Sequence, residues 1–142
     1  MKNEMTLAFD SISENEAFAR VAVAAFVTQL NPTLEEVADL KTAVSEAVTN
    51  CIVHAYPDHI GPVTVTAAIY EGGIVRITVS DRGVGIPDVA KAMEPMFTTG
   101  DAEERAGLGF AVMQSFMDKV RVSSAPGRGT RVTLTKRLQA RT

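Results

Sequence analysis

The order of helix-like and strand-like segments is the feature that most restricts the fold of this chain. Two long helices are predicted early, over 14–30 and 34–55, because Pro32 separates them and Pro57 follows the second. Alternating or β-branched apolar runs predict strands at 5–9, 63–70, 74–80, 120–124 and 130–136. Early helices followed by strands that connect through short turns predict a two-layer α+β sandwich.

Local signals place the connections between these elements. Thr33 and Glu36, three residues apart, have the form of a capping box at the start of the second helix. The turn Glu71-Gly72-Gly73 predicts a hairpin between two strands. The remaining expected segments are a short helix at 88–93, a loop at 97–106 and a third helix at 107–117.

Composition limits the class of protein without defining its function. A chain of 142 residues with 46% hydrophobic and 22% charged residues is expected to form a single domain over 1–142. Its formal net charge of −3 argues against nonspecific binding of nucleic acid. The lone Cys51 favours a reducing cytoplasm, and the longest aliphatic run, 21–27, is too short to cross a membrane.

The first predicted helix is apolar nearly all round. A surface helix normally carries one apolar stripe, so a second buried face toward a partner chain is one explanation. The abundance of alanine, a good helix former, is the alternative. A homodimer or a partner-binding surface is therefore expected here, with Glu16 and Arg20 as candidate polar contacts on the exposed side.

Glu46 and Asn50 are the first residues that suggest chemistry. They stand four positions apart on the second helix, so their side chains share one face with apolar neighbours. The Asn oxygen suits Mg²⁺, and Glu46 is placed to accept a proton from an attacking hydroxyl. An exposed Glu and an Asn that bonds locally are the alternative. His54, one turn later, is expected to be a packed helix-end residue.

A second signal is the stretch Asp81-Arg-Gly-Val-Gly, at the end of a predicted strand. The carboxylate of Asp81 can accept a hydrogen bond from an adenine amine, and Gly83 and Gly85 allow close approach of a planar ligand. An ordinary Asp-Gly turn is the alternative. No third glycine stands at position 88, so this is not a dinucleotide-binding fingerprint.

A third signal is Gly107-Leu-Gly109, which precedes an apolar helical segment. Free backbone N–H groups at a helix N-terminus bind anions. Arg105, just before the glycines, is the candidate to contact a terminal phosphate, with a solvated arginine as the alternative.

Taken together, these motifs resemble the nucleotide-binding boxes of the GHKL ATPase superfamily. The matching residues, in order, are Glu46-x-x-x-Asn50, Asp81-x-Gly83-x-Gly85, Gly107-x-Gly109 and Thr130. Over nearly its whole length the chain is similar to the bacterial anti-sigma factor serine kinases, especially at 46–56 and 81–87. The resemblance implies a Bergerat-type sandwich, in which helices cover one face of a mixed, mostly antiparallel sheet.

The resemblance also implies a role for each matched position. Glu46 would be the catalytic base, Asn50 the Mg²⁺ ligand, and Asp81 with Thr130 the adenine-binding pair. Gly83 and Gly85 would shape the base pocket. The phosphates of ATP or ADP would lie against Gly107 and Gly109, under a lid at about 95–106 that carries Arg105.

The implied function is an ATP-dependent serine/threonine protein kinase that also acts as an anti-sigma factor. It would inhibit a sporulation sigma factor and phosphorylate an anti-anti-sigma factor, without direct contact to nucleic acid or membrane. Two alternatives stay open. One is a nucleotide-gated inhibitor without significant kinase turnover, and the other is a histidine-kinase-like catalytic domain.

Overall fold

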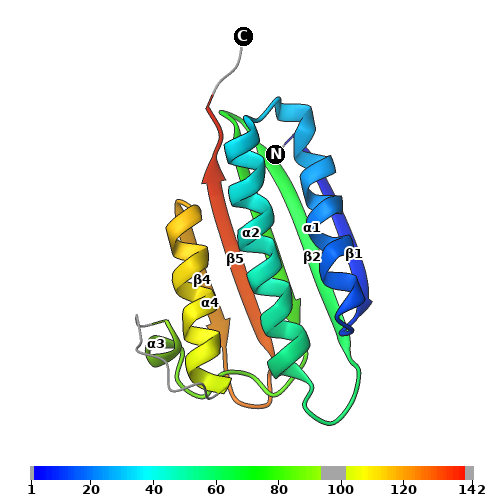
Figure 1. The fold of residues 1–142 in the computed structure, drawn as a ribbon, viewed down its shortest axis with the longest axis vertical. Coiled ribbons are helices and arrows are strands. Elements are labelled where there is room, and N and C mark those ends of the chain that lie inside the picture. Colours follow the sequence, from blue (N-terminus) through cyan, green and yellow to red (C-terminus); the bar gives the residue numbers. More distant parts are fainter. Residues whose placement is uncertain (1, 94–101, 140–142) are drawn as a thin grey trace.

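A five-stranded sheet and a layer of helices form the two layers of the protein (Figure 1). The computed structural model describes residues 2–93 and 102–139, and of residues 102–107 it describes the backbone alone. The strand order is β1-β2-β3-β5-β4, and all four neighbouring pairs are antiparallel. The predicted α+β sandwich is therefore confirmed, with a sheet that is antiparallel throughout rather than mixed.

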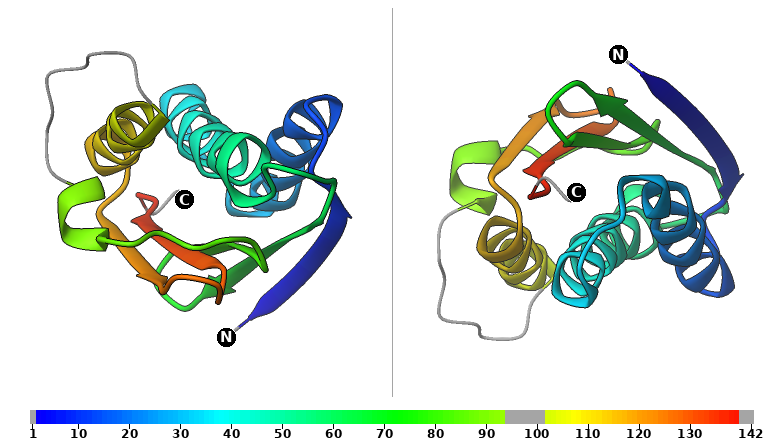
Figure 2. Two further views of the ribbon diagram at one scale, coloured as in Figure 1. Left: turned by 90° about the horizontal axis from the view of Figure 1, so that it is seen from below. Right: turned by 90° about the horizontal axis from the view of Figure 1, so that it is seen from above.

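The helices lie on one side of the sheet (Figure 2). The strands are β1 (Asn3–Asp10), β2 (Pro62–Tyr70), β3 (Ile74–Asp81), β4 (Lys119–Ser124) and β5 (Thr130–Arg137). The helices are α1 (Glu14–Val27), α2 (Leu34–Asn50), α3 (Val89–Ala92) and α4 (Ala102–Phe116). Within the described part of the chain, none of the helices has both the length and the apolar character needed to span a bilayer.

The core fills the space between the two layers. Alternate residues of the strands point toward the helices, and Val65, Ile77 and Leu134 are fully buried there. Phe110 and Met113 bring α4 down onto the same core, and α2 contributes a buried stripe of Leu40, Ala43, Val44, Ala47 and Val48. This packing fixes α2 between α1 and α4, so its polar residues must lie at the seams between helices.

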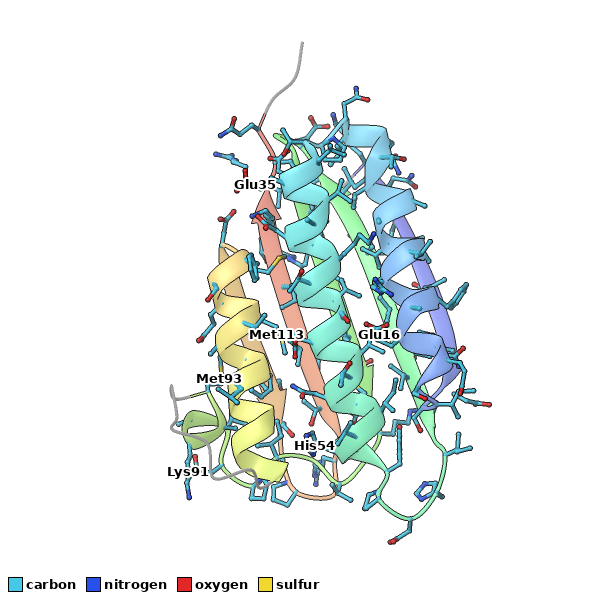
Figure 3. All side chains as sticks on the ribbon, viewed as in Figure 1. Glu16, Glu35, His54, Lys91, Met93 and Met113 are labelled. Carbon is cyan, nitrogen blue, oxygen red and sulfur yellow. The ribbon has the colours of Figure 1, made fainter. Side chains whose placement is uncertain are left out.

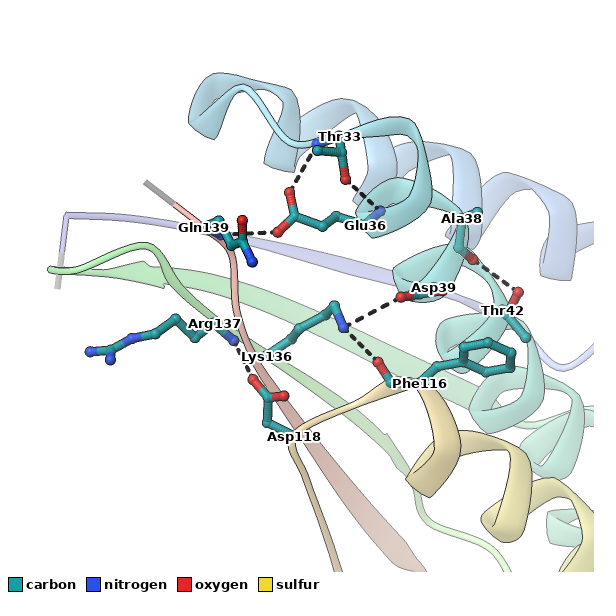
Figure 4. Close-up of polar contacts among 10 residues, drawn as sticks. All are labelled: Thr33, Glu36, Ala38, Asp39, Thr42, Phe116, Asp118, Lys136, Arg137 and Gln139. Atoms are coloured by element: carbon teal, nitrogen blue, oxygen red, sulfur yellow. Dashed lines mark hydrogen bonds and ion pairs between the residues drawn. The ribbon is translucent and has the colours of Figure 1, made fainter. Parts of the chain in front are cut away.

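The second predicted helix forms as α2 followed by a π-helical turn. The capping box is present: the Thr33 hydroxyl accepts from the Glu36 amide at 3.0 Å, and the Thr33 amide donates to Glu36 Oε1 at 2.9 Å (Figure 4). At the other end the hydrogen-bond pattern widens over Cys51–Ala55. Such turns often occur at functional sites, and this one directly follows Asn50.

The third helix begins earlier than the sequence predicts. α4 starts at Ala102, so the expected loop at 97–106 is wrong for residues 102–106, and residues 97–101 lie outside the described part. Gly107 and Gly109 consequently lie inside α4 and not at its start. The short helix expected at 88–93 forms as α3.

Lys136 of β5 connects α2 and α4 to the sheet, at the end of the molecule opposite to the loop that follows β3. Its ammonium group donates to the Phe116 carbonyl at 2.8 Å and pairs with the Asp39 carboxylate at 3.5 Å (Figure 4). The Lys136 and Asp39 side chains are 14% and 20% exposed, so water screens this pair less than a surface pair. We call these three residues the Lys136 clasp.

Replacing Lys136 with Met should lower the free energy of unfolding by about 1–3 kcal/mol, because it leaves a half-buried carboxylate and a carbonyl without their donor. Urea denaturation of both proteins measures the difference. Lys119→Met, at an exposed position of β4, is the matched control and should change stability by less than about 0.5 kcal/mol. Equal stability of the two variants would contradict this role for the clasp.

Candidate functional site

The predicted residues of α2, β3 and β5 meet around one small cavity. Asn50, Asp81 and Thr130 line it together with Gly85, and its volume is about 50 Å³. The rest of the lining is mostly apolar and comprises Ala47, Cys51, His54, Ala55, Ile86, Phe110 and Val132. A few polar groups that converge in an apolar cavity are typical of a ligand site, although this volume is too small for a nucleotide.

Gly109 connects the two predicted motifs on the helices. A Cβ atom at this position would lie 3.2 Å from both Glu46 Oε2 and Asn50 Nδ2. The missing side chain therefore lets α4 pack directly on the polar face of α2. The structure brings Glu46, Asn50 and Gly109 into contact, although Asn50 and Gly109 are 59 positions apart in the chain.

The Glu46 carboxyl group lies in an environment that disfavours its charge. Partial burial is the main cause of its raised pKa, and the negative charge of Glu16 raises the pKa further. Glu16 itself accepts from the Ser45 hydroxyl and pairs with Arg20 at 3.3 Å. A carboxyl group with a raised pKa is better suited to accept a proton near neutral pH than an ordinary glutamate.

The position of Glu16 differs from the sequence expectation. Its side chain points into the space between α1 and α2 (Figure 3) and is 22% exposed, so it does not belong to the outer side of α1. The outer side instead carries Phe18 and Val21, which are 52% and 56% exposed. The apolar surface predicted for this helix is thus present, and the Glu16–Arg20 pair lies beside it.

The Asn50 carboxamide lies at the seam between α2 and α4. Its Nδ2 is buried and has no partner among the described residues. Buried polar groups without a partner are rare and costly, and they often mark a place where a ligand binds. The carboxamide can donate to a phosphate oxygen and offer its own oxygen to Mg²⁺, so the residues present fit a magnesium nucleotide.

Asp81 ends β3 with its carboxylate held by its own neighbours. Oδ1 accepts from the Gly83 amide at 2.9 Å, and the buried Cys51 thiol donates to the same side chain. Burial is the main cause of the raised pKa of Cys51, and the charge of Asp81 raises it further, so the thiol remains a protonated donor. Sequence reasoning did not include Cys51 in the site, since a single cysteine on a helix gives no such signal.

Gly83 and Gly85 are required by the protein's own backbone. A Cβ atom at Gly83 would lie 2.1 Å from the Ala55 carbonyl oxygen, and one at Gly85 would lie 2.0 Å from that of Ala125. Gly85 also has a φ of +78°, in the region that favours glycine. Close approach of a planar ligand to these glycines stays a prediction, but Gly85 does line the cavity.

Two further residues that sequence reasoning missed hold this loop in place. The Tyr56 hydroxyl accepts from the Arg82 amide at 2.7 Å and donates to the Pro62 carbonyl at 2.6 Å. The Ser124 hydroxyl accepts from the Ile86 amide at 2.8 Å and lies 2.9 Å from Thr130 Oγ1. Ser124 thereby connects the loop that follows Asp81 to Thr130, the late residue of the motif set.

The remaining predicted residues lie on α4. Free N–H groups belong to the first turn of a helix, and Gly107 stands beyond the first turn of α4. The expected anion site at the start of a helix therefore does not coincide with the two glycines. Contact of Gly107 and Gly109 with phosphates stays a prediction, and the side chain of Arg105 lies outside the described part.

Comparisons with known proteins agree with this fold. Residues 11–136 match the model of the histidine kinase-like ATPase domain. The anti-sigma F factor of Caldanaerobacter subterraneus subsp. tengcongensis is 60% identical over 134 residues, which cover 94% of this chain and 93% of the relative. The anti-sigma F factor of Pasteuria penetrans is 56% identical over 140 residues, which cover 98% and 93% of the two chains. This chain belongs to the histidine kinase-like ATPase family and, within it, to the anti-sigma F factors.

Solved structures show the same fold at lower identity. The RsbU and RsbW domains of Rv1364c from Mycobacterium tuberculosis align with a TM-score of 0.70 at 23% identity, over 99% of this chain and 34% of that one. The mycobacterial sensor histidine kinase MprB aligns with a TM-score of 0.58 at 16% identity, over 96% and 100%.

Replacing Asn50 with Leu should raise the free energy of unfolding by about 1 kcal/mol in the absence of nucleotide, because it removes a buried donor that has no partner in the described part of the chain. The same change should abolish nucleotide binding. Thermal melts with and without Mg-ATP measure both effects. Thr49→Leu, at an exposed position of the same helix, controls for helix propensity, and an equal gain in that variant would count against a ligand site at Asn50.

Replacing Glu46 with Gln should stabilise the protein increasingly as pH rises. A carboxyl group whose pKa is raised on folding lowers stability above its unfolded pKa, and it has no such effect when protonated in both states. The stability gain of Glu46→Gln should therefore be present at pH 8 and approach zero toward about pH 4. Urea denaturation across this range measures it.

The matched control for this prediction is Glu35→Gln in the first turn of α2. There a negative charge favours the helix, so its loss should lower stability slightly at neutral pH, opposite to the effect at Glu46. A Glu46→Gln gain that does not change with pH would contradict the electrostatic explanation.

Proposed function

We propose that this protein is an anti-sigma factor and an ATP-dependent serine/threonine protein kinase, acting as one ATPase/kinase domain. Its protein substrate is a serine of an anti-anti-sigma factor, and its inhibited target is a sporulation sigma factor. The proposal is supported by the anti-sigma F factor relatives and, in the structure, by the contact of Gly109 with both Glu46 and Asn50.

The roles of the residues follow from their surroundings. Asp81 offers a carboxylate oxygen toward the adenine amine, and Thr130 assists from the neighbouring strand. Asn50 holds the nucleotide through its carboxamide. Glu46 accepts the proton of the attacking serine hydroxyl, and its raised pKa makes it a more effective base than an exposed glutamate. Mg²⁺, when bound, neutralises charge that develops on the phosphates.

Nucleotide binding requires the cavity to enlarge. A volume of about 50 Å³ has room for a few water molecules but not for adenine. Because α4 packs on Glu46 and Asn50 through Gly109, an outward shift of α4 exposes both side chains together. Binding of ATP or ADP therefore couples to the position of α4, which would allow the nucleotide to influence partner choice.

The partners would bind on the helical side of the molecule. Phe18 and Val21 leave an apolar surface on α1 that suits a homodimer or the sigma factor. A groove between α1 and α2, lined by Arg20, Thr42 and Glu46, gives access to the proposed base. A substrate serine that enters through this groove would approach Glu46 directly.

The test is phosphoryl transfer from radiolabelled ATP to a purified anti-anti-sigma factor. Wild type should give acid-stable phosphoserine, and Glu46→Gln should lower the rate at least about a hundredfold, because loss of a general base costs about 10²–10⁴-fold in rate. Binding of a fluorescent ATP analogue to the same variant should stay within about threefold of wild type. Near-normal transfer by Glu46→Gln would remove Glu46 from the role of base.

The same assay separates the alternatives. A nucleotide-gated inhibitor would bind sigma factor with a nonhydrolysable ATP analogue yet transfer no phosphate. A histidine-kinase-like domain would give an acid-labile product. Either result would overturn the proposed serine kinase activity, and the second would also change the class of substrate.

A further inference from the structure

On the side opposite the helices, the part of the sheet formed by β3, β5 and β4 is strongly basic. In β3, β5 and β4, outward-facing residues alternate with residues that face the helices. All the outward-facing residues are polar except Ile74. Five of them are exposed basic residues: Arg76, Lys119, Arg121, Arg131 and Arg137. We call this set the basic sheet face. No helix covers it in the described part of the chain (Figure 2).

Among the described residues, the outward positions of β3, β5 and β4 carry positive charge without acidic side chains between them. All residues of these three strands are described, and none of their outward positions holds Asp or Glu. Among the described residues, no ion pair engages Arg121 or Arg131. The register pairs Arg121 with Thr133 and Ser123 with Arg131, so the two arginines are diagonal neighbours. Like charges at such spacing repel, which an anionic partner would relieve.

A groove gives this face a binding geometry. It has a volume of about 730 Å³ and lies where Thr64, Ser80, Arg131 and Ser123 form one row across four strands. Arg82 and Arg128 line the same groove from the adjoining loops, and both are exposed. Three guanidinium groups, one carboxylate (Asp81) and several hydroxyl groups thus line the groove, so its basic residues outnumber its acidic one. Guanidinium forks match carboxylates bidentately, and hydroxyls can donate further hydrogen bonds to them.

We propose that the basic sheet face and its groove bind an extended acidic segment of a partner protein. Neighbouring strands are about 4.8 Å apart, and the arginines at diagonal positions are about 7–8 Å apart, which matches alternate side chains of an extended peptide. Arg121 and Arg131 lie on the side of the sheet opposite to Glu46 and Asn50, although one end of the groove shares Asp81 and Thr130 with the proposed kinase site. The inference therefore goes beyond the proposed function and does not depend on it.

The observations favour an acidic polypeptide over nucleic acid. Duplex binding extends over many phosphates, and the chain as a whole has 17 acidic against 14 basic residues. Single strands are held by exposed aromatic rings. Tyr70, at the end of β2, lies on this side of the sheet. Arg76 Cζ stands 4.9 Å from the centroid of its ring, so a side chain of the protein already covers this ring. Carboxylates at peptide spacing suit separated arginines better than a continuous phosphate backbone does.

The test uses fluorescence polarisation of a labelled peptide of alternating glutamate and serine. Wild type should bind it, and rising salt should weaken the binding. The double variant Arg121→Glu/Arg131→Glu should bind at least about tenfold more weakly, a loss of about 1.4 kcal/mol. The control Lys41→Glu/Lys91→Glu changes net charge equally on the helical side and should stay within about twofold. Nucleotide binding by the sheet variant should be unchanged.

Several outcomes would overturn the proposal. Equal loss in both double variants would show that net charge alone attracts the peptide. Tighter binding of a labelled DNA duplex than of the peptide, lost in the sheet variant, would assign the face to nucleic acid. Loss of self-association in sedimentation, without loss of peptide binding, would assign it to contact between copies. If charge reversal prevents folding, Arg121→Gln/Arg131→Gln replaces it, and unchanged peptide binding by that variant refutes the proposal.

Discussion

The absence of a side chain at Gly109 is the constraint on which the site depends. It lets α4 come within contact distance of Glu46 and Asn50, so two polar residues of α2 lie at the seam between helices. Partial burial there raises the pKa of Glu46, and Asn50 Nδ2 has no partner among the residues that the structure describes. Both effects disfavour the ligand-free arrangement, and in the proposed binding mode a nucleotide would give the Asn50 donor an acceptor. The energetic cost of the site and its capacity to bind thus have one origin.

The loop that follows Asp81 differs from the seam between α2 and α4, because hydrogen bonds within the protein hold this loop firmly. The π-helical turn supplies the Ala55 carbonyl to the Val84 amide at 2.9 Å, and the Gly127 amide donates to the Val84 carbonyl at 2.7 Å. Tyr56 and Ser124 bind the loop on either side. In the proposed function, this firmly held loop would bind the base while α4, on the other side of the same cavity, adjusts its position. Such preorganisation lowers the entropic cost of ligand binding.

Sequence reasoning located the strands, the hairpin and the capping box because each depends on neighbours in the chain. It also selected Glu46, Asn50, Asp81 and Thr130, three of which line the cavity. It placed the start of α4 too late, since glycines at 107 and 109 disfavour a helix while tertiary packing sustains one. It did not find the hydrogen bonds of Tyr56 and Ser124, which reach 26 and 38 residues along the chain, and no local pattern encodes such contacts.

The Lys136 clasp has a mechanical consequence for α4. It fixes the C-terminal end of the helix, where Lys136 binds the Phe116 carbonyl, while the predicted nucleotide contacts lie toward the other end. Because α4 is fixed at its C-terminal end, a small rotation about that end produces a larger displacement at its N-terminal end. With a rise of 1.5 Å per residue, a tilt of about 10° about the clasp would move the first turn by about 4 Å, roughly the thickness of a purine ring. The core near the anchored end would scarcely be disturbed.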